Sequence, residues 1–121
     1  IESQVSGVAR DWINDPASIE HVLPENPVAG WDAVIPVERQ AQAVYRLGNL
    51  TLLEKTLNRD AGNKLFDEKK PIYAQSEYRL TRALEEYAPP EWSLAAITER
   101  QRQLAHRAAS VWRSDFAGAC E

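Results

Sequence analysis

The sequence predicts an α+β domain that is mostly helical and contains two short strands. The strands are expected at residues 18–23 and 49–53, where short apolar runs end at residues that break regular structure. Helices are expected over most of the remainder, above all in the last third, where apolar residues recur at helical spacing. With 121 residues, of which 44% are hydrophobic, the chain is long enough for one domain with a small core.

In the first half of the chain, prolines and glycines mark the expected ends of each element. Residues 1–13 have apolar residues at helical spacing and precede Asp15-Pro16, which predicts a short helix. The strand at 18–23 should stop at Pro24, because proline cannot donate a hydrogen bond to a strand ladder. Residues 24–36 contain three prolines and one glycine, which predicts a loop. We expect Trp31 to anchor this loop in the core.

The other helices follow from apolar spacing and from end signals. Residues 37–47 should form a helix that stops at Gly48, and another helix should begin near Glu54 and carry Asn58. A helix over 76–87 is expected to start with Ser76 as its N-cap, and the longest helix is expected over 91–115. The expected apolar stripe of the longest helix is Leu94, Ile97, Leu104, Ala108, Val111 and Trp112. Four basic residues are expected on the opposite face of this helix, where they are solvated or, as the alternative, contact DNA: Arg100, Arg102, Arg107 and Arg113.

Composition limits the function classes that fit. Cys120 is the only cysteine, which excludes a disulfide framework and a cysteine-based zinc site and fits a cytoplasmic protein. The net charge of −4 counts against nucleic-acid binding through overall charge. No apolar run approaches the roughly 20 residues that a membrane span needs. Because the chain begins with Ile1 rather than Met, we expect it to be the C-terminal piece of a longer protein.

Two motifs carry groups that suit phosphodiester hydrolysis. The first is Ile19-Glu20-His21-Val22-Leu23-Pro24, and the second is Gly48-Asn49-Leu50-Thr51-Leu52-Leu53, which is followed by Asn58. Hydrolysis at neutral pH needs a base that activates water, and histidine is suited to that task. It also needs positive charge near the phosphate, which a divalent cation held by oxygen ligands supplies.

Each of these polar residues can be given one task. We expect His21 to be the general base and Glu20 and Asn58 to bind the cation, which is Mg²⁺ or else Mn²⁺. Asn49 is expected to brace the His21 loop by hydrogen bonds. Neighbouring side chains of a strand point to opposite faces, so Glu20 and His21 share a target only if the strand bends or bulges before Pro24. Asn63 follows a glycine, and the alternatives for it are a helix cap and a metal or phosphate role. For three lysines that follow closely, contact with phosphate is the functional alternative to simple solvation: Lys64, Lys69 and Lys70.

The same residues resemble a known family. The order acid-His-x-x-Pro, a central Asn, and a further Asn nine residues later is similar to the ββα-metal (HNH) endonucleases. The resemblance implies a small ββα core with a two-stranded antiparallel hairpin, surrounded by helices. It also implies that Glu20 and Asn58 bind metal, that His21 is the base and that Asn49 supports its loop. The chain departs from many HNH proteins in having Glu rather than Asp as the first acid, and it lacks a zinc-binding cysteine pair.

One branch of that family is closer. The segments IEHVLP, RLGNLTLLEKTLN and GNKLFDEK, with a distal tryptophan-containing helix, resemble the C-terminal nuclease domain of GmrSD-type modification-dependent restriction enzymes and related phage-defence nucleases. This resemblance implies nicking or double-strand cleavage of foreign or modified DNA in bacterial defence. It further implies an N-terminal ParB-like, nucleotide-using partner domain and a homo-oligomer through the parent protein. The alternative is a catalytically degenerate module of the same fold that binds DNA or a partner domain.

Overall fold

The fold is known from a computed structural model, which describes residues 15–87 and 91–120, with side chains up to residue 110. The helix expected over residues 1–13 therefore lies outside the described residues, as do the side chains of Val111 and Trp112. Within the described ranges the chain is mostly helical and has a two-stranded antiparallel sheet, as predicted.

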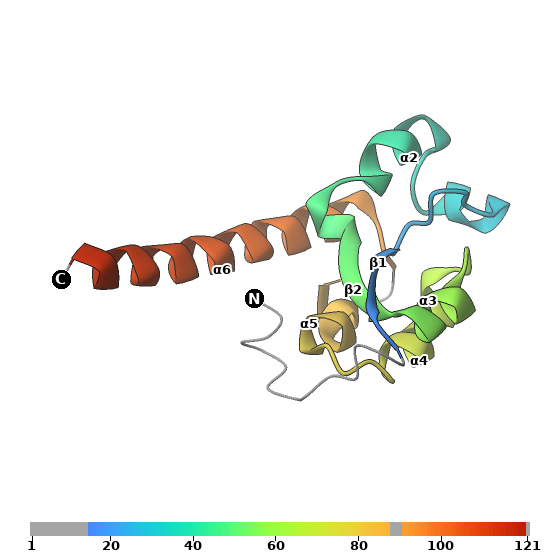
Figure 1. Ribbon diagram of the computed structural model, residues 1–121. Coiled ribbons are helices and arrows are strands. Elements are labelled where there is room, and N and C mark those ends of the chain that lie inside the picture. The colour runs from blue at the N-terminus through green and yellow to red at the C-terminus, as the bar shows by residue number, and fades with distance from the viewer. Residues whose placement is uncertain (1–14, 88–90, 121) are drawn as a thin grey trace.

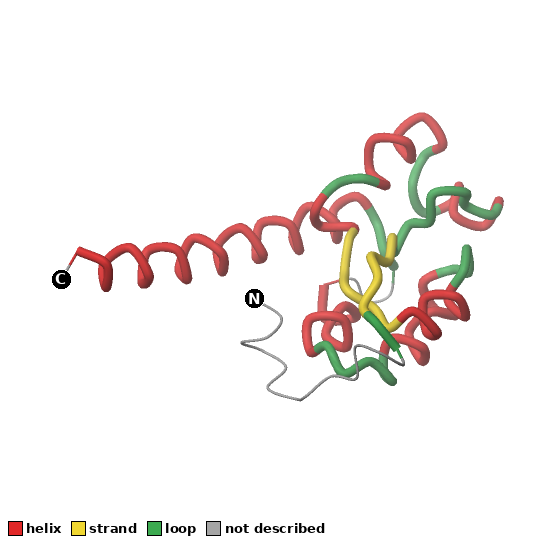
Figure 2. The backbone as a smooth tube through the Cα atoms, viewed as in Figure 1, coloured by secondary structure: helices red, strands yellow, loops and turns green. Residues whose placement is uncertain are grey.

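The two strands form a regular hairpin-like pair at the centre of the domain (Figure 2). Strand β1 spans Ala17–His21 and strand β2 spans Leu50–Glu54. The pairing runs residue by residue, from Ala17 opposite Glu54 to His21 opposite Leu50. The ends differ by one or two residues from those expected. No extra residue interrupts this register, so the bend that was expected to turn Glu20 and His21 to one side is absent from the paired strands.

Helices cover the outer edge and one face of this sheet. Helix α3 (Lys55–Ala61) starts directly after β2 and contacts both strands and α4 (Phe66–Tyr73). Helix α4 has no counterpart in the sequence-based expectations, and it holds Pro71 inside its last turn. Figure 1 shows α3 and α4 beside the strands at the lower right of the molecule.

The long connection between the strands is more ordered than expected. The predicted loop contains a 3-10 helix, η1 (Ala29–Ala33), in which Trp31 is buried as predicted and donates from Nε1 to the carbonyl of Lys64 at 3.2 Å. Helix α2 (Val37–Val44) then ends three residues before the expected end, and the 3-10 helix η2 (Leu47–Asn49) leads into β2. This connection brings Asn49 back beside the end of β1.

The region after α4 corrects one expected helix start. Helix α5 spans only Arg79–Arg82 and continues as the 3-10 helix η3 (Ala83–Tyr87), with Tyr78 in the N-cap position. The expectation that Ser76 caps this helix is wrong. Its hydroxyl donates to Glu54 at 2.7 Å and accepts the backbone N–H of Tyr78 at 3.1 Å, so it serves the turn before the helix.

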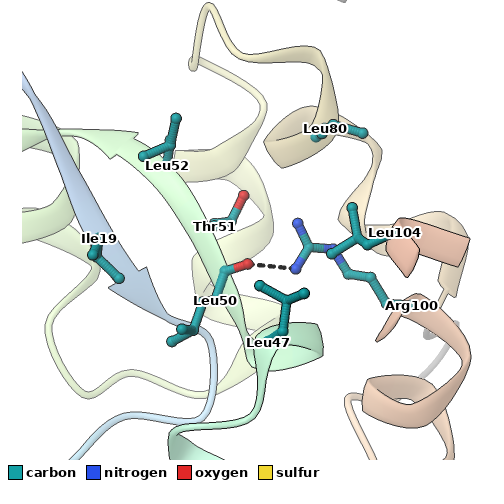
Figure 3. Close-up of a pocket in the computed structure, with 8 residues that line it drawn as sticks. All are labelled: Ile19, Leu47, Leu50, Thr51, Leu52, Leu80, Arg100 and Leu104. Atoms are coloured by element: carbon teal, nitrogen blue, oxygen red, sulfur yellow. Dashed lines mark hydrogen bonds between the residues drawn. The ribbon is translucent and has the colours of Figure 1, made fainter. Parts of the chain in front are cut away.

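Helix α6 (Leu94–Cys120) is the longest element, as predicted, and its first turns lie against the rest of the domain while its later part extends away (Figure 1). Arg100 was expected on its solvated face, which is wrong. The spacing of three residues from Ile97 and four to Leu104 places Arg100 within the inward-facing stripe. Arg100 is buried and donates through Nη1 to the carbonyls of Gly48 and Leu50. Figure 3 shows its guanidinium reaching β2 at the wall of an apolar pocket.

The core lies between the sheet and the helices. Its largest apolar members are Val22, Leu23, Trp31, Ile35, Leu53, Phe66, Leu84, Trp92 and Ile97. Two of them, Val22 and Leu23, directly follow β1, so the chain turns into the core immediately after His21. In the described ranges we find no helix that is both long and apolar enough to cross a membrane.

Gly48, in η2, lies directly against the backbone of α6. A Cβ atom at Gly48 would lie 2.1 Å from the carbonyl oxygen of Ile97 and 3.0 Å from the backbone nitrogen of Gln101. We predict that Gly48→Ala lowers the free energy of unfolding by about 3 kcal/mol, because the helix backbone must move away. Urea unfolding followed by circular dichroism measures this. Gly30→Ala is the control, since its Cβ would meet only the flexible Leu65 side chain. Equal stability of the two variants would contradict the prediction.

Candidate active site

Strand β1 separates the side chains of Glu20 and His21. Alternation along the strand places them on opposite faces. Glu20 shares its face with Thr51 and Leu53 and is buried, whereas the His21 side chain is 21% exposed. The pair that looked like one unit in the sequence is therefore divided between the interior and the surface.

The Glu20 carboxylate lies in a buried polar cluster with two residues of α4. Its Oε2 atom accepts a hydrogen bond from the hydroxyl of Tyr73 at 2.5 Å and lies 3.0 Å from Nζ of Lys69. Burial, and then the negative charge of Glu20, raise the pKa of Tyr73 well above its usual value. Burial lowers the pKa of Lys69, and the charge of Glu20 opposes that shift. Tyr73 therefore stays a neutral donor to the carboxylate.

Lys69 is fully buried and contacts the backbone beside His21. Its Nζ donates to the carbonyl oxygens of His21 at 3.1 Å and Val22 at 3.0 Å. The sequence-based alternatives for Lys69 were solvation or phosphate contact. The structure places it instead inside the domain, where the ammonium is surrounded by protein oxygens.

Asn49 holds the same stretch of chain from the other side. Its Oδ1 accepts the N–H of Leu23 at 2.8 Å, and its Nδ2 donates to the carbonyl of Leu23 at 3.0 Å. Trp92 also donates to Oδ1 at 2.9 Å, and Nδ2 reaches the carbonyl of Val44 at 2.9 Å. The Asn49 carbonyl accepts the N–H of Val22 at 3.0 Å. Asn49 thus lies where the sequence analysis expected it, hydrogen-bonded to the chain that follows His21.

Asn58 lies at the outer edge of β1. Its Nδ2 donates to the hydroxyl of Ser18 at 2.8 Å and to the carbonyl of Ile19 at 3.1 Å. A cation would need the amide oxygen instead. Within residues 15–87 and 91–120, no hydrogen bond to that oxygen is found. Asn58 therefore ties α3 to β1 and keeps one ligand-type atom available.

The Glu20 carboxylate, one of the two predicted metal ligands, is already paired inside the domain. The Glu20 carboxylate is 3% exposed, and its Oε2 is already paired with Lys69. Binding a hydrated cation there would require Lys69 to leave. Among the described residues, no group of three or more His, Cys, Asp or Glu side chains could hold a metal ion. The prediction that these two residues bind metal stays a prediction.

Of the remaining predicted residues, Asn63 and Lys64 lie on the surface after α3, and Lys70 lies in α4. Asn63 donates from Nδ2 to the carbonyl of Asn26 at 3.4 Å, and Lys64 donates from Nζ to the carbonyl of Asp60. Asn63 thereby links the chain beyond Pro24 to the α3–α4 connection. Lys70 lies over the Phe66 ring and pairs with Asp67 at 3.1 Å. Their proximity to phosphate stays a prediction.

Two residues beside His21 were not found from the sequence. Glu25 Oε1 lies 3.9 Å from Nδ1 of His21, and Glu25 Oε2 accepts the hydroxyl of Tyr45 at 2.8 Å. That hydrogen bond raises the pKa of Tyr45. The Tyr45 ring meets the imidazole edge-on, with ring centroids 5.8 Å apart. An acid four residues after the histidine was a usable signal for Glu25, whereas Tyr45 is remote in sequence.

This arrangement can support proton transfer at one nitrogen of His21. The carboxylate of Glu25 lies on the Nδ1 side, at ion-pair distance but beyond a direct hydrogen bond. Because Glu25 lies on the Nδ1 side, Nε2 is the ring nitrogen on the other side and the candidate proton acceptor. The side chain is partly exposed, so water and substrate can reach it.

One protein family matches the chain over residues 2–107: the C-terminal domain of GmrSD restriction endonucleases. The match includes both strands and every predicted site residue, and it ends within α6. No curated protein and no solved structure matches the chain.

Asn49 is expected to be among the most sensitive positions for folding. We predict that Asn49→Ala lowers the free energy of unfolding by about 3 kcal/mol, because it leaves the buried N–H groups of Leu23 and Trp92 without an acceptor. Asn49→Asp is expected to cost at least as much, since it loses both donors and buries a charge. Denaturant unfolding measures both. The control is Asn63→Ala at the surface, which should change stability by about 0.5 kcal/mol or less. An Asn49→Asp variant as stable as the original chain would refute this account.

Proposed function

Because the chain belongs to the C-terminal domain family of the GmrSD restriction endonucleases, we propose that it hydrolyses phosphodiester bonds of DNA with His21 as general base. The family itself gives the domain a nuclease role related to restriction. The observation that supports His21 is its setting: a partly exposed imidazole on a strand end whose backbone is hydrogen-bonded from two sides. Such fixed placement is what general-base catalysis requires.

The proposed reaction is an in-line displacement at phosphorus. Nε2 of His21 takes a proton from water, and the water oxygen forms a bond to phosphorus. The bond between phosphorus and the leaving oxygen then breaks, and that oxygen takes up a proton from solvent. Glu25, whose carboxylate lies 3.9 Å from Nδ1, is proposed to hold the ring orientation.

A divalent cation, most simply Mg²⁺ with Mn²⁺ as the alternative, is proposed as cofactor on the chemistry of the reaction. When bound, it would neutralise charge that grows on the phosphate. Glu20 and Asn58 are the residues that the family resemblance offers for it. Because Glu20 is buried and paired with Lys69, no step of the reaction is assigned to a cation at Glu20.

The proposed biological role is bacterial defence against foreign or modified DNA in the cytoplasm. The net charge of −4 favours a division of labour in which another part of the parent protein, a ParB-like nucleotide-using domain, holds the DNA. A single site of this kind cuts one strand at a time. Double-strand cleavage would therefore need two copies of the domain, brought together by the parent protein.

The second candidate is a catalytically degenerate module that binds DNA or a partner domain. The burial of Glu20 favours it, because that residue is occupied in holding the fold. The partly exposed His21 with its acidic neighbour favours the enzyme instead, since a scaffold has no need of that pair at its surface.

The leading proposal predicts that His21→Ala abolishes cleavage without unfolding the domain. His21 contributes its backbone to β1 but keeps its side chain partly outside the core, so the circular dichroism spectrum should not change. Plasmid nicking in Mg²⁺ or Mn²⁺ buffer, with and without EDTA, measures the activity. We expect a loss of at least roughly 100-fold in His21→Ala, the size of a general-base contribution, and complete loss with EDTA. His106→Ala, on the exposed part of α6, is the matched control. Undiminished nicking by His21→Ala would contradict the proposal that His21 is the general base.

Glu25 is predicted to be a positioning residue for His21. Glu25→Ala should lower kcat by about 10-fold with little change in KM, because ring orientation matters in the transition state and not in DNA binding. Glu25→Gln keeps an oxygen acceptor near Nδ1 and should retain more activity. Glu86→Gln, an exposed acid on η3, controls for the loss of negative charge. A faster Glu25→Ala enzyme with a lower KM would mean that Glu25 only repels DNA.

A further inference from the structure

We infer that Lys69 is a built-in cation that positions His21, and that Glu20 serves this lysine rather than a metal ion. The rate readouts of this inference rest on the proposed nuclease function, whereas its binding and stability readouts do not. Three protein oxygens lie around Nζ of Lys69 at similar distances: Glu20 Oε2 at 3.0 Å, His21 O at 3.1 Å and Val22 O at 3.0 Å.

These three contacts use the full hydrogen-bonding capacity of the ammonium group. A lysine ammonium has three N–H donors, and one protein oxygen is available here for each. The side chain is fully buried, so no donor remains for a DNA phosphate. An acidic oxygen and two carbonyl oxygens around a positive charge are also the kind of ligand set that a hard metal ion takes. The ammonium therefore occupies the place that a cation at Glu20 would need.

The two carbonyls explain what this arrangement does. In a straight strand, consecutive carbonyl groups point to opposite sides. The carbonyls of His21 and Val22 both reach one nitrogen atom, so the chain must leave the strand conformation between them. Lys69 thus stabilises the turn that ends β1 directly at His21. Tyr73 completes the arrangement by fixing the Glu20 carboxylate with its hydroxyl group.

The energetics of a buried ion pair fit a role for Glu20 and Lys69 in positioning His21 better than a role in stabilising the fold. A buried ion pair gains little over an apolar pair of the same size, because both charges lose their hydration. Removing one partner, in contrast, leaves an uncompensated buried charge. Glu20 and Lys69 should therefore be strongly coupled to each other, and both should act on His21 through the backbone of residues 21 and 22.

The first experiment asks whether Glu20 binds metal. Mn²⁺ binding to the whole chain is measured by electron paramagnetic resonance for the original sequence, Glu20→Gln and Asn58→Ala. We expect Glu20→Gln to bind Mn²⁺ within about two-fold of the original, while its denaturation midpoint falls. A loss of 10-fold or more in Mn²⁺ affinity in folded Glu20→Gln would overturn the inference. If the original chain binds no Mn²⁺, Glu20 is not a metal ligand in this domain, which supports it.

The second experiment separates positioning from phosphate contact. Lys69→Met removes the charge at nearly constant length. We expect its kcat for plasmid nicking to fall at least 10-fold, with KM and its salt dependence unchanged. A raised KM with a weaker salt dependence would instead assign Lys69 to phosphate and overturn the inference. Lys55→Met, an exposed lysine at the start of α3 with no assigned role, is the matched control.

The double variant Glu20→Gln/Lys69→Met guards against simple misfolding. It removes both buried charges, so it should be more stable than Lys69→Met alone, and its kcat should stay low because the turn has lost its cation. Full recovery of kcat in the double variant would overturn the positioning role. If the original chain shows no nicking at all, the proposed function fails. The amide resonances of residues 21–23, which should shift in Lys69→Met and not in Lys55→Met, then test the inference alone.

Discussion

The turn that follows His21 is the constraint on which the candidate site depends. Polar groups hold it from two sides. The Asn49 side chain accepts the N–H of Leu23 and donates to its carbonyl. The Lys69 ammonium donates to the carbonyls of His21 and Val22. Each of the two has its own buried support, Trp92 for Asn49 and Glu20 for Lys69. A fully satisfied buried network of this kind is rigid, because any change leaves a polar group unpaired. The imidazole is therefore placed by the interior of the domain although it lies at its surface.

Sequence reasoning found the residues that act through short-range patterns. The two strands follow from apolar runs that end at Pro24 and at Glu54, and Asn49 follows from its place directly before the second run. The mostly helical α+β class follows from the spacing of apolar residues in the rest of the chain. Each of these patterns involves residues that are close together in the chain, so it can be recognised in a single sequence.

The sequence could not reveal where long polar side chains go once the chain has folded. Lysine and arginine are almost always exposed, so a solvated face was the sound expectation for Lys69 and Arg100. Both are buried because unpaired carbonyl groups at strand and turn ends need donors: His21 and Val22 for Lys69, Gly48 and Leu50 for Arg100. Those partners lie some 50 residues away along the chain. Helix α4 holds Pro71 near its end, and it tolerates this proline because only one backbone hydrogen bond is removed there.

Strand alternation gives the adjacent Glu20 and His21 two different tasks. One side chain must point inward if the other points outward, so an acid directly before a surface histidine is well placed to organise the interior beneath it. On the proposed function, this leaves the chemistry to His21 and its exposed neighbours. Glu25 places one negative charge of this domain, whose net charge is −4, at that surface. On the same proposal, Glu25 would repel the DNA backbone while it orients His21, and the proposed DNA-holding partner domain would offset that repulsion.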